Sequence, residues 1–263
     1  MTYIHNLSPV LLKLGPLEIR WYGLMYVLAF LAVLWFLRKA SREKRLPLSY
    51  EDIDSFMTWQ VIALITGARL FAVFFWEPAY YLSHPLEIIA VWKGGLSFHG
   101  GLAGMLIAGY VWCRRKKVNM LELADVVIVP LALGQAFGRF GNFMNSELYG
   151  PPTTLPWGIN FLNETKAGSL VFRHPTMLYE LLYDLVIFAV LLLMSKRKWK
   201  TGTIFATFLI LYAILRSLTE LIRLEDVYVG PLTMGQMLNI PMLLVGVYLL
   251  SKSRCTNNKK MCT

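Results

Sequence analysis

Residues 138–150 place several polar side chains and glycines at the end of a run that is apolar from Val126 onward. The stretch reads Gly-Arg-Phe-Gly-Asn-Phe-Met-Asn-Ser-Glu-Leu-Tyr-Gly, so it combines a guanidinium, two carboxamides and a carboxylate. Hydrogen-bonding groups gathered at the end of a membrane span usually bind a polar molecule. The three glycines let the backbone turn tightly and approach a ligand closely. We therefore take this stretch as the candidate site that the other segments surround.

A second group of polar residues recurs at helical spacing. Tyr212, Arg216 and Glu220 are four residues apart, and Arg223 lies seven beyond Arg216, so on one helix they form a single stripe. In one interpretation, Arg216, Glu220 and Arg223 are an ion-pair ladder that pins helices together. We favour the other, in which the stripe faces a cavity and at least one arginine binds an anionic headgroup. Arg139 is expected at a similar depth, and two guanidiniums suit bidentate phosphate binding.

His99 is a candidate general base. It lies within the glycine-rich stretch 94–104, where its imidazole is expected to be accessible. Histidine titrates near pH 6.5 and is the commonest general base, although a hydrogen-bonded residue at a helix end is an alternative role. Gly100 and Gly104 are in GxxxG spacing, which close helix packing explains without any chemistry.

The composition indicates which elements must position these residues. The chain has 263 residues, of which 56% are hydrophobic and only 16% are charged, and this balance predicts a polytopic membrane protein. About 20 apolar residues span a bilayer. Seven segments qualify, so we expect an all-α fold in a single integral membrane domain, residues 1–263. The segments are 17–37, 55–76, 97–114, 121–140, 175–195, 203–223 and 233–251.

The connecting segments predict the orientation of the chain. Most of the 26 Lys and Arg residues lie in or around 38–53, 114–117, 196–200 and 252–260, which would share one side of the membrane. By the positive-inside rule that side is cytoplasmic, so the N-terminus is expected outside and the C-terminus inside. The net charge of +10 then mainly reflects the basic segments that stay on the cytoplasmic side of the membrane, and no nucleic-acid partner is predicted.

Four arginines remain within or at the ends of spans: Arg69, Arg139, Arg216 and Arg223. An arginine at mid-bilayer costs roughly 2.5–3.5 kcal/mol on insertion scales, so such residues face wet cavities, pair with carboxylates or bind anions. Candidate partners are Asp125, Glu147, Glu180, Asp184 and Glu220. Glu180 and Asp184, four residues apart, are expected to be counter-ions for the arginines.

Residues 141–174 are too polar and too rich in proline for a span. We expect a periplasmic loop with little regular structure, or a small subdomain. No Cys/His cluster suggests a metal, and the three cysteines all fall in segments placed on the cytoplasmic side, so no disulfide framework is implied.

These motifs together resemble the bacterial prolipoprotein diacylglyceryl transferases. The resemblance covers Trp21-Tyr22-Gly23, Gly67-Ala68-Arg69, Ser97 to Gly101, Gly138 to Gly150, Arg173-His174-Pro175, Leu178-Tyr179-Glu180 and Arg216 to Arg223. Met177 and Ala72 depart from the family's pattern, where glutamine and tyrosine are usual. The resemblance implies transfer of the diacylglyceryl group of phosphatidylglycerol to the lipobox cysteine of a prolipoprotein signal peptide. A thioether would form and glycerol phosphate would leave, as the first step of lipoprotein maturation.

The resemblance also implies roles for single residues. Arg139 and Arg216 would bind and stabilise the phosphate, and His99 would be the candidate base. Whether His99 or an arginine activates the thiol stays open. The implied substrate-binding residues are Tyr22, Arg69, Asn142, Asn145, Glu147, Gly150, Tyr212, Glu220 and Arg223. No cofactor or metal is expected, and the enzyme would lie in the phospholipid bilayer of the bacterial cytoplasmic (inner) membrane, with its site toward the outer leaflet.

A transporter or channel for organic phosphates is the alternative function, because embedded arginines would serve it equally well. The odd number of spans and the absence of an internal repeat argue against it. So do the nearly pure hydrocarbon segments 186–193 and 243–250, because a transport path needs polar groups on both sides of the membrane.

Overall fold

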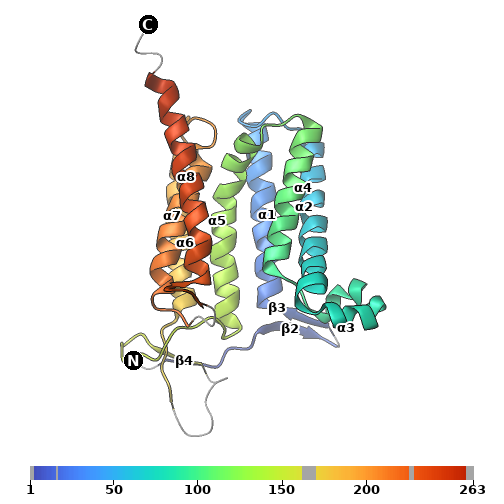
Figure 1. Cartoon of the computed structure of the whole chain (residues 1–263), viewed down its shortest axis with the longest axis vertical. Helices are drawn as coiled ribbons and strands as arrows, with labels where there is room; N and C mark the ends of the chain where they lie inside the picture. The colour runs from blue at the N-terminus through green and yellow to red at the C-terminus, as the bar shows by residue number, and fades with distance from the viewer. Residues whose placement is uncertain (1–2, 16, 162–169, 225–227, 259–263) are drawn as a thin grey trace. The chain divides into compact units, whose positions relative to one another are not determined.

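The computed structural model describes residues 3–15, 17–161, 170–224 and 228–258 (Figure 1). The chain divides into two compact units, one formed by Met1–Phe36 and Ala124–Thr263 and the other by Leu37–Leu123. Each unit is described by itself below. Lys259, Lys260 and Cys262, which were counted among the basic residues and the cysteines of the sequence, lie outside the described residues.

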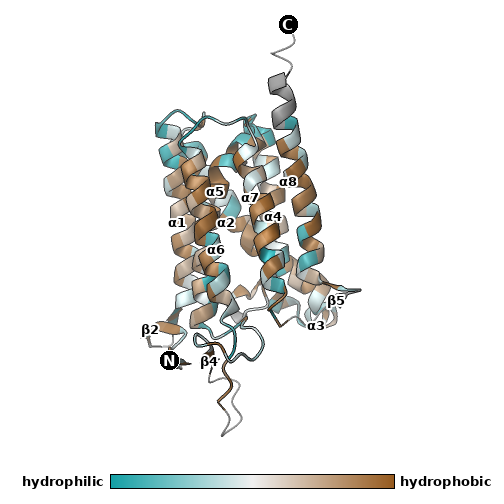
Figure 2. Cartoon of the chain, turned by 90° about the vertical axis from the view of Figure 1, so that its left-hand side faces the viewer, coloured by the Kyte–Doolittle hydropathy of each residue, from teal (hydrophilic) through white to brown (hydrophobic). Residues whose placement is uncertain are grey.

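The seven predicted segments are all helical. The long helices of the described part are α1 (Trp21–Arg42), α2 (Tyr50–Phe71), α4 (Phe98–Lys116), α5 (Met120–Met144), α6 (Thr176–Ser195), α7 (Thr203–Glu220) and α8 (Met234–Asn258). Six are long and apolar enough to cross a membrane: α1, α2 with its extension to Trp76, α5, α6, α7 and α8. Figure 2 shows hydrophobic residues along much of their length. The glycines and His99 of α4, together with its basic end, make that helix less apolar.

Helix boundaries differ from the expectation where local hydrogen bonds decide them. The first span was expected to begin at residue 17, but β3 (Leu17–Arg20) pairs antiparallel with β2 (Val10–Leu14) and α1 begins at Trp21. Helix α2 begins earlier than expected, because Ser49 caps it. The Ser49 hydroxyl accepts from the Asp52 amide, and the Asp52 carboxylate accepts from the Ser49 amide. Helix α7 ends at Glu220, so Arg223 lies beyond the helix that was expected to carry it.

The core of the larger unit joins α5, α6 and α7. Ala132 on α5 and Ile187 and Leu191 on α6 are fully buried in this core, and Phe208 on α7 is largely buried. Helix α8 packs along α7, where Gly246 lies against Ile210. This apolar packing fixes the helix ends from which the polar residues project.

Short regular elements occur at two places in the described part of 141–174. Helix α5 continues to Met144, and β4 (Ile159–Phe161) pairs in parallel with β1 (Tyr3–His5) at the start of the chain. Arg173 bridges to Ile159 on the other side of β4. Within the described residues of this segment, only 141–144 are helical and only 159–161 form a strand, and whether the segment is a loop or a small subdomain stays a prediction. Residues 162–169 lie outside the described residues.

In the smaller unit, α2 and α4 pack closely through glycines. A side chain at Gly100 would collide with the carbonyl oxygen of Gly67, and one at Gly104 would collide with the carbonyl oxygen of Ala63. Gly104 also lies against the Cα of Gly67, at 3.2 Å from the position of the missing Cβ. The packing role predicted for the Gly100 and Gly104 pair is confirmed.

This geometry predicts a difference between two glycines of α4. We expect Gly104→Ala to lower the free energy of unfolding by about 1–3 kcal/mol, because the added methyl group meets backbone atoms that cannot move aside. Gly109 faces only the flexible Gln60 amide, 3.4 Å from the missing Cβ. Gly109→Ala should therefore be neutral or stabilising by up to about 1 kcal/mol, through helix propensity. Thermal unfolding of both variants in detergent measures this, and equal melting temperatures would contradict it.

Candidate functional site

One buried carboxylate on α6 binds three guanidinium groups. The Nε atom of Arg139, on α5, lies 2.8 Å from Oε2 of Glu180. Nη1 of Arg223 lies 3.3 Å from Oε1, and Arg216 on α7 pairs with the same oxygen. Arg216 also pairs with Glu220 one helical turn further on. We call these five residues, Arg139, Glu180, Arg216, Glu220 and Arg223, the arginine cluster.

The cluster is more open on its cationic side. The carboxylate side chains of Glu180 and Glu220 are 1% and 0% exposed, whereas those of Arg139, Arg216 and Arg223 are 19%, 12% and 12% exposed. The guanidiniums are therefore the more accessible part of the cluster, and an approaching anion meets them first.

The ion-pair interpretation of the arginine stripe is confirmed in part, and the interpretation in which an arginine binds an anionic headgroup stays a prediction. Arg216 and Glu220 form the predicted ion pair, yet Arg223 reaches Glu180 on another helix. Glu180 is confirmed as a counter-ion. Asp184 is fully buried, and neither of its oxygens has a hydrogen-bond partner among the described residues.

Asp125, one of the predicted counter-ions, contacts two backbone amides at the start of α7. Its carboxylate accepts from the amides of Gly202 and Phe205, at 2.6 and 2.8 Å, and so caps the start of α7. An acidic side chain is favourable at this end of a helix.

The residues that follow Arg139 form a hydrogen-bonded turn at the end of α5. The amides of Asn142 and Asn145 both donate to Oε1 of Glu147, at 2.7 and 3.3 Å, and the side chain of Asn142 is largely buried. Ser146 and Leu148 have φ angles of 55° and 62°. Non-glycine residues adopt this left-handed conformation rarely, and such strain persists where surrounding contacts hold it. The Glu147 carboxylate is thereby presented on an exposed turn.

Two further residues that were predicted to bind substrate, Tyr22 and Gly150, make close contacts in this region. The ring of Tyr22 packs on Gly141, whose missing Cβ would lie 2.6 Å from the Tyr22 ring. Gly150 is enclosed by Thr176, His174 and the carbonyl of Ile222, so no side chain fits there.

Tyr212 stacks on Phe208 and meets the Tyr183 ring edge-on, one turn before Arg216. These contacts make Tyr212 part of the packing beneath the cluster.

His5 makes a contact with Ser146 that was not predicted from the sequence. It is 2% exposed, its Nδ1 lies 3.0 Å from the Ser146 hydroxyl, and its ring meets Phe143 edge-on at 4.6 Å. Burial lowers the pKa of His5 below its usual value. The N-terminal strand is thereby attached to the strained turn. The only sequence signal was an isolated histidine near the start, and its partner lies 141 residues away.

Arg69 and His99 belong to the smaller unit. The Arg69 guanidinium donates to the carbonyl oxygens of Ile88, Gly94 and Gly95, at 2.9, 2.6 and 3.1 Å, and to that of Glu87. It also lies 4.9 Å above the Tyr81 ring. Arg69 therefore holds the segment before α4 in place, and these contacts favour a structural role over substrate binding.

His99 is the second residue of α4, and its side chain is exposed as expected. Ser97 caps the helix by accepting from the Gly100 amide. The His99 ring meets the ring of its neighbour Phe98 edge-on, with 5.7 Å between the ring centroids.

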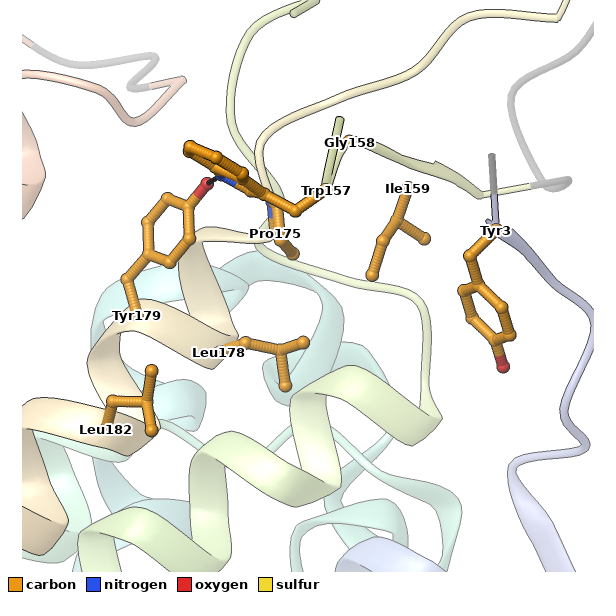
Figure 3. A pocket seen from close by; sticks show the side chains of 8 residues that line it. All are labelled: Tyr3, Trp157, Gly158, Ile159, Pro175, Leu178, Tyr179 and Leu182. Carbon is orange, nitrogen blue, oxygen red and sulfur yellow. Dashed lines mark hydrogen bonds between the residues drawn. The ribbon is translucent and has the colours of Figure 1, made fainter. Parts of the chain in front are cut away.

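The N-terminal end of α6 also has an apolar face. A hollow of about 510 Å³ is lined by Tyr3, Trp157, Gly158, Ile159, Pro175, Leu178, Tyr179 and Leu182 (Figure 3). On one side of the hollow, the Trp157 indole donates to the Tyr179 hydroxyl at 2.8 Å. Glu180 lies on the buried side of the same helix, so the hollow is separate from the arginine cluster. No group of three or more His, Cys, Asp or Glu side chains in the described part of the chain could hold a metal ion.

Comparison with known proteins matches almost the whole chain to one family. Residues 9–252 match the family described as prolipoprotein diacylglyceryl transferase. A phosphatidylglycerol–prolipoprotein diacylglyceryl transferase of Geobacter sulfurreducens is 42% identical over 247 residues, covering 92% of this chain and 94% of the relative. Enzymes of the same name from Bordetella avium and Cupriavidus metallidurans are 42% and 41% identical, over 95% and 91% of this chain and 96% and 90% of theirs.

The buried His5 predicts a pH-dependent attachment of the N-terminal strand. A histidine with a lowered pKa binds protons more readily when exposed, so the attachment is strongest above about pH 6.5 and weakens as the pH falls below it. The loss is at most about 1.4 kcal/mol per pH unit, and it ends at the lowered pKa of the buried ring. Hydrogen exchange of β1 and β4, corrected for intrinsic rates, should accelerate between pH 7.5 and 5.5. His5→Gln should remove this dependence, and an unchanged dependence in that variant would contradict the assignment.

Proposed function

We propose a role for each of these residues, on the basis that this chain belongs to the prolipoprotein diacylglyceryl transferase family and transfers the diacylglyceryl group of phosphatidylglycerol to a prolipoprotein. The acceptor is the lipobox cysteine of the prolipoprotein signal peptide. The cysteine sulfur attacks the carbon of the diacylglyceryl group that is bonded to a phosphate oxygen. A C–S bond forms, and the bond between that carbon and the phosphate oxygen breaks. The products are a thioether and glycerol phosphate, and the thiol proton passes to a base.

The arginine cluster stabilises the leaving phosphate. The phosphodiester of the substrate carries one negative charge, and the phosphate monoester that leaves gains a second as the C–O bond breaks. Donors already aimed at the developing charge lower the barrier most. The observation that carries this assignment is the burial of both carboxylates beneath three partly exposed guanidiniums. Arg139 and Arg216 bind the phosphate, and Glu180, Glu220 and Arg223 hold them in place.

The turn after Arg139 orients the substrate. Asn142 and Asn145 fix the exposed Glu147 carboxylate, which accepts hydrogen bonds from the hydroxyl groups of the glycerol headgroup. Tyr22, packed on Gly141, closes one side of this region, and the bare backbone at Gly150 allows Ile222 to pack closely against it.

His99 activates the thiol in this proposal. A thiol with a pKa of about 8.5 is mostly protonated at neutral pH, so a base within reach speeds formation of the thiolate. The exposed ring of His99 suits proton uptake from a bound substrate. The alternative, in which the arginines alone favour the thiolate, predicts no effect of His99 on the pH dependence of the rate.

The distribution of basic residues supports the orientation. With α4 as the seventh span, the basic segments gather on the cytoplasmic side and the N-terminus lies outside. Arg139 then lies toward the outer leaflet of the cytoplasmic (inner) membrane. In this arrangement, the site and its lipid substrate share that leaflet with the lipobox cysteine.

Replacing Arg216 by lysine tests the phosphate role. We expect Arg216→Lys to lower kcat about 100-fold or more, because a point charge keeps the ion pairs but loses the bidentate fork. The assay is the mass gain of a lipobox peptide incubated with the enzyme and phosphatidylglycerol. Arg38→Lys, in an exposed pair with Asp54, is the matched control and should keep normal turnover. Near-normal turnover of Arg216→Lys would contradict the phosphate role.

The pH–rate profile tests His99. We expect His99→Gln to slow transfer by about 100-fold near neutral pH, where little thiolate forms unaided, and less at alkaline pH. The measurement is kcat/KM between pH 6 and pH 10, and a profile that keeps the wild-type shape would show that His99 is not the base.

A further inference from the structure

The first turn of α8 is built beside the Glu220 carboxylate, although α8 contributes no residue to the arginine cluster. Strand β6 (Leu232–Thr233) leads directly into this helix. The Thr233 hydroxyl accepts a hydrogen bond from the backbone amide of Gln236 at 3.1 Å. The side-chain oxygen of Gln236 accepts one from the backbone amide of Thr233 at 3.2 Å. This reciprocal pair is a capping box, which fixes the start of α8.

The capping Thr233 also holds Glu220. Its hydroxyl donates to Oε2 of Glu220 at 2.8 Å, and Thr233 is 5% exposed. A hydroxyl has one hydrogen to donate, and here it goes to the carboxylate. The other oxygen of Glu220 pairs with Arg216. Glu220 therefore connects the start of α8 to the guanidinium.

Gly235 provides the space that this carboxylate occupies. A Cβ at residue 235 would lie 2.7 Å from Cδ and Oε1 of Glu220 and 2.9 Å from Oε2. Non-bonded atoms prefer about 3.5–4.0 Å, so no other residue fits without moving Glu220. The positive end of the helix dipole also favours a carboxylate here. This contact explains a glycine in a helix, where it costs about 1 kcal/mol relative to alanine.

We propose that Gly235 is a positioning residue for Arg216, acting through Glu220. This inference depends on the proposed function, because it takes Arg216 to bind the leaving phosphate. An alanine methyl group at residue 235 takes the place of the carboxylate. The carboxylate ends a flexible side chain, so the fold accommodates the methyl group by displacing it. Arg216 then loses one of the two carboxylates that fix its orientation, while Glu180 still holds the other side.

The first measurement compares two glycines of α8. We expect Gly235→Ala to remain folded and to lower kcat about tenfold or more, the size expected for losing a hydrogen bond to a charged group. KM for phosphatidylglycerol should change less, because the charge on the phosphate grows only in the transition state. Gly246→Ala is the matched control. Its methyl group would lie 2.8 Å from Cγ1 of Ile210, so it should lower the melting temperature while kcat stays normal.

The second measurement tests the route through Glu220. In a Glu220→Ala background no carboxylate remains to be displaced, so adding Gly235→Ala should change kcat less than about twofold. Thr233→Val should lower kcat without adding bulk at residue 235, and Thr233→Ser, which keeps the hydroxyl, should restore it. These variants also decide the matter if Gly235→Ala fails to fold.

The outcomes separate this inference from the proposed function. If Arg216→Lys keeps its activity, the phosphate role is wrong and the inference falls with it. If Arg216→Lys is inactive but Gly235→Ala has normal kcat, or costs a further tenfold in the Glu220→Ala background, only the positioning role of Gly235 is overturned. Normal kcat in Thr233→Val would overturn it as well.

Discussion

The Glu180 carboxylate, shared by three guanidiniums, is the interaction on which the site depends. Each arginine would be costly in an apolar surrounding without a partner, and a single buried carboxylate beneath all three lowers that cost. Glu220 adds a second carboxylate to Arg216. The arrangement therefore stabilises three arginines in one cluster, which we propose as the site that holds the leaving phosphate.

The surrounding elements hold this cluster from several directions. The apolar core of α5, α6 and α7 fixes the helices that carry Arg139, Glu180 and Arg216. The turn after α5 is strained at Ser146 and Leu148, and contacts from distant parts of the chain hold it, including His5 from the N-terminal strand. Thr233, just before α8, donates a hydrogen bond that holds the Glu220 carboxylate in place. Most of these contacts come from a different segment of the chain than the residue that they hold in place.

This separation explains what the sequence could predict. Apolar runs predicted all seven long helices, because their length and composition are local properties. Ends set by capping, as at Ser49, and by strand pairing, as at Leu17–Arg20, were placed wrongly. Spacing along one helix found the Arg216 and Glu220 pair, and Glu180 was predicted as a counter-ion. That all three arginines share Glu180 could not be predicted, since it requires three helices to meet. Arg69 looked like the other embedded arginines, yet backbone carbonyls surround it. Neither the capping pair of Thr233 and Gln236 nor the contact of Gly235 with Glu220 was predicted from the sequence.

A direct measurement of the contact between phosphate and arginine tests the central claim. The protein, labelled with ¹⁵N in its arginine side chains, is reconstituted into phosphatidylglycerol bilayers, and solid-state NMR measures dipolar dephasing between ³¹P and ¹⁵N. The account predicts short-range dephasing of a bound phosphate signal, and its loss when Arg139 and Arg216 are both replaced by lysine. Absence of dephasing in the wild type, or an undiminished effect in the double variant, would contradict the claim that a lipid phosphate docks on this cluster.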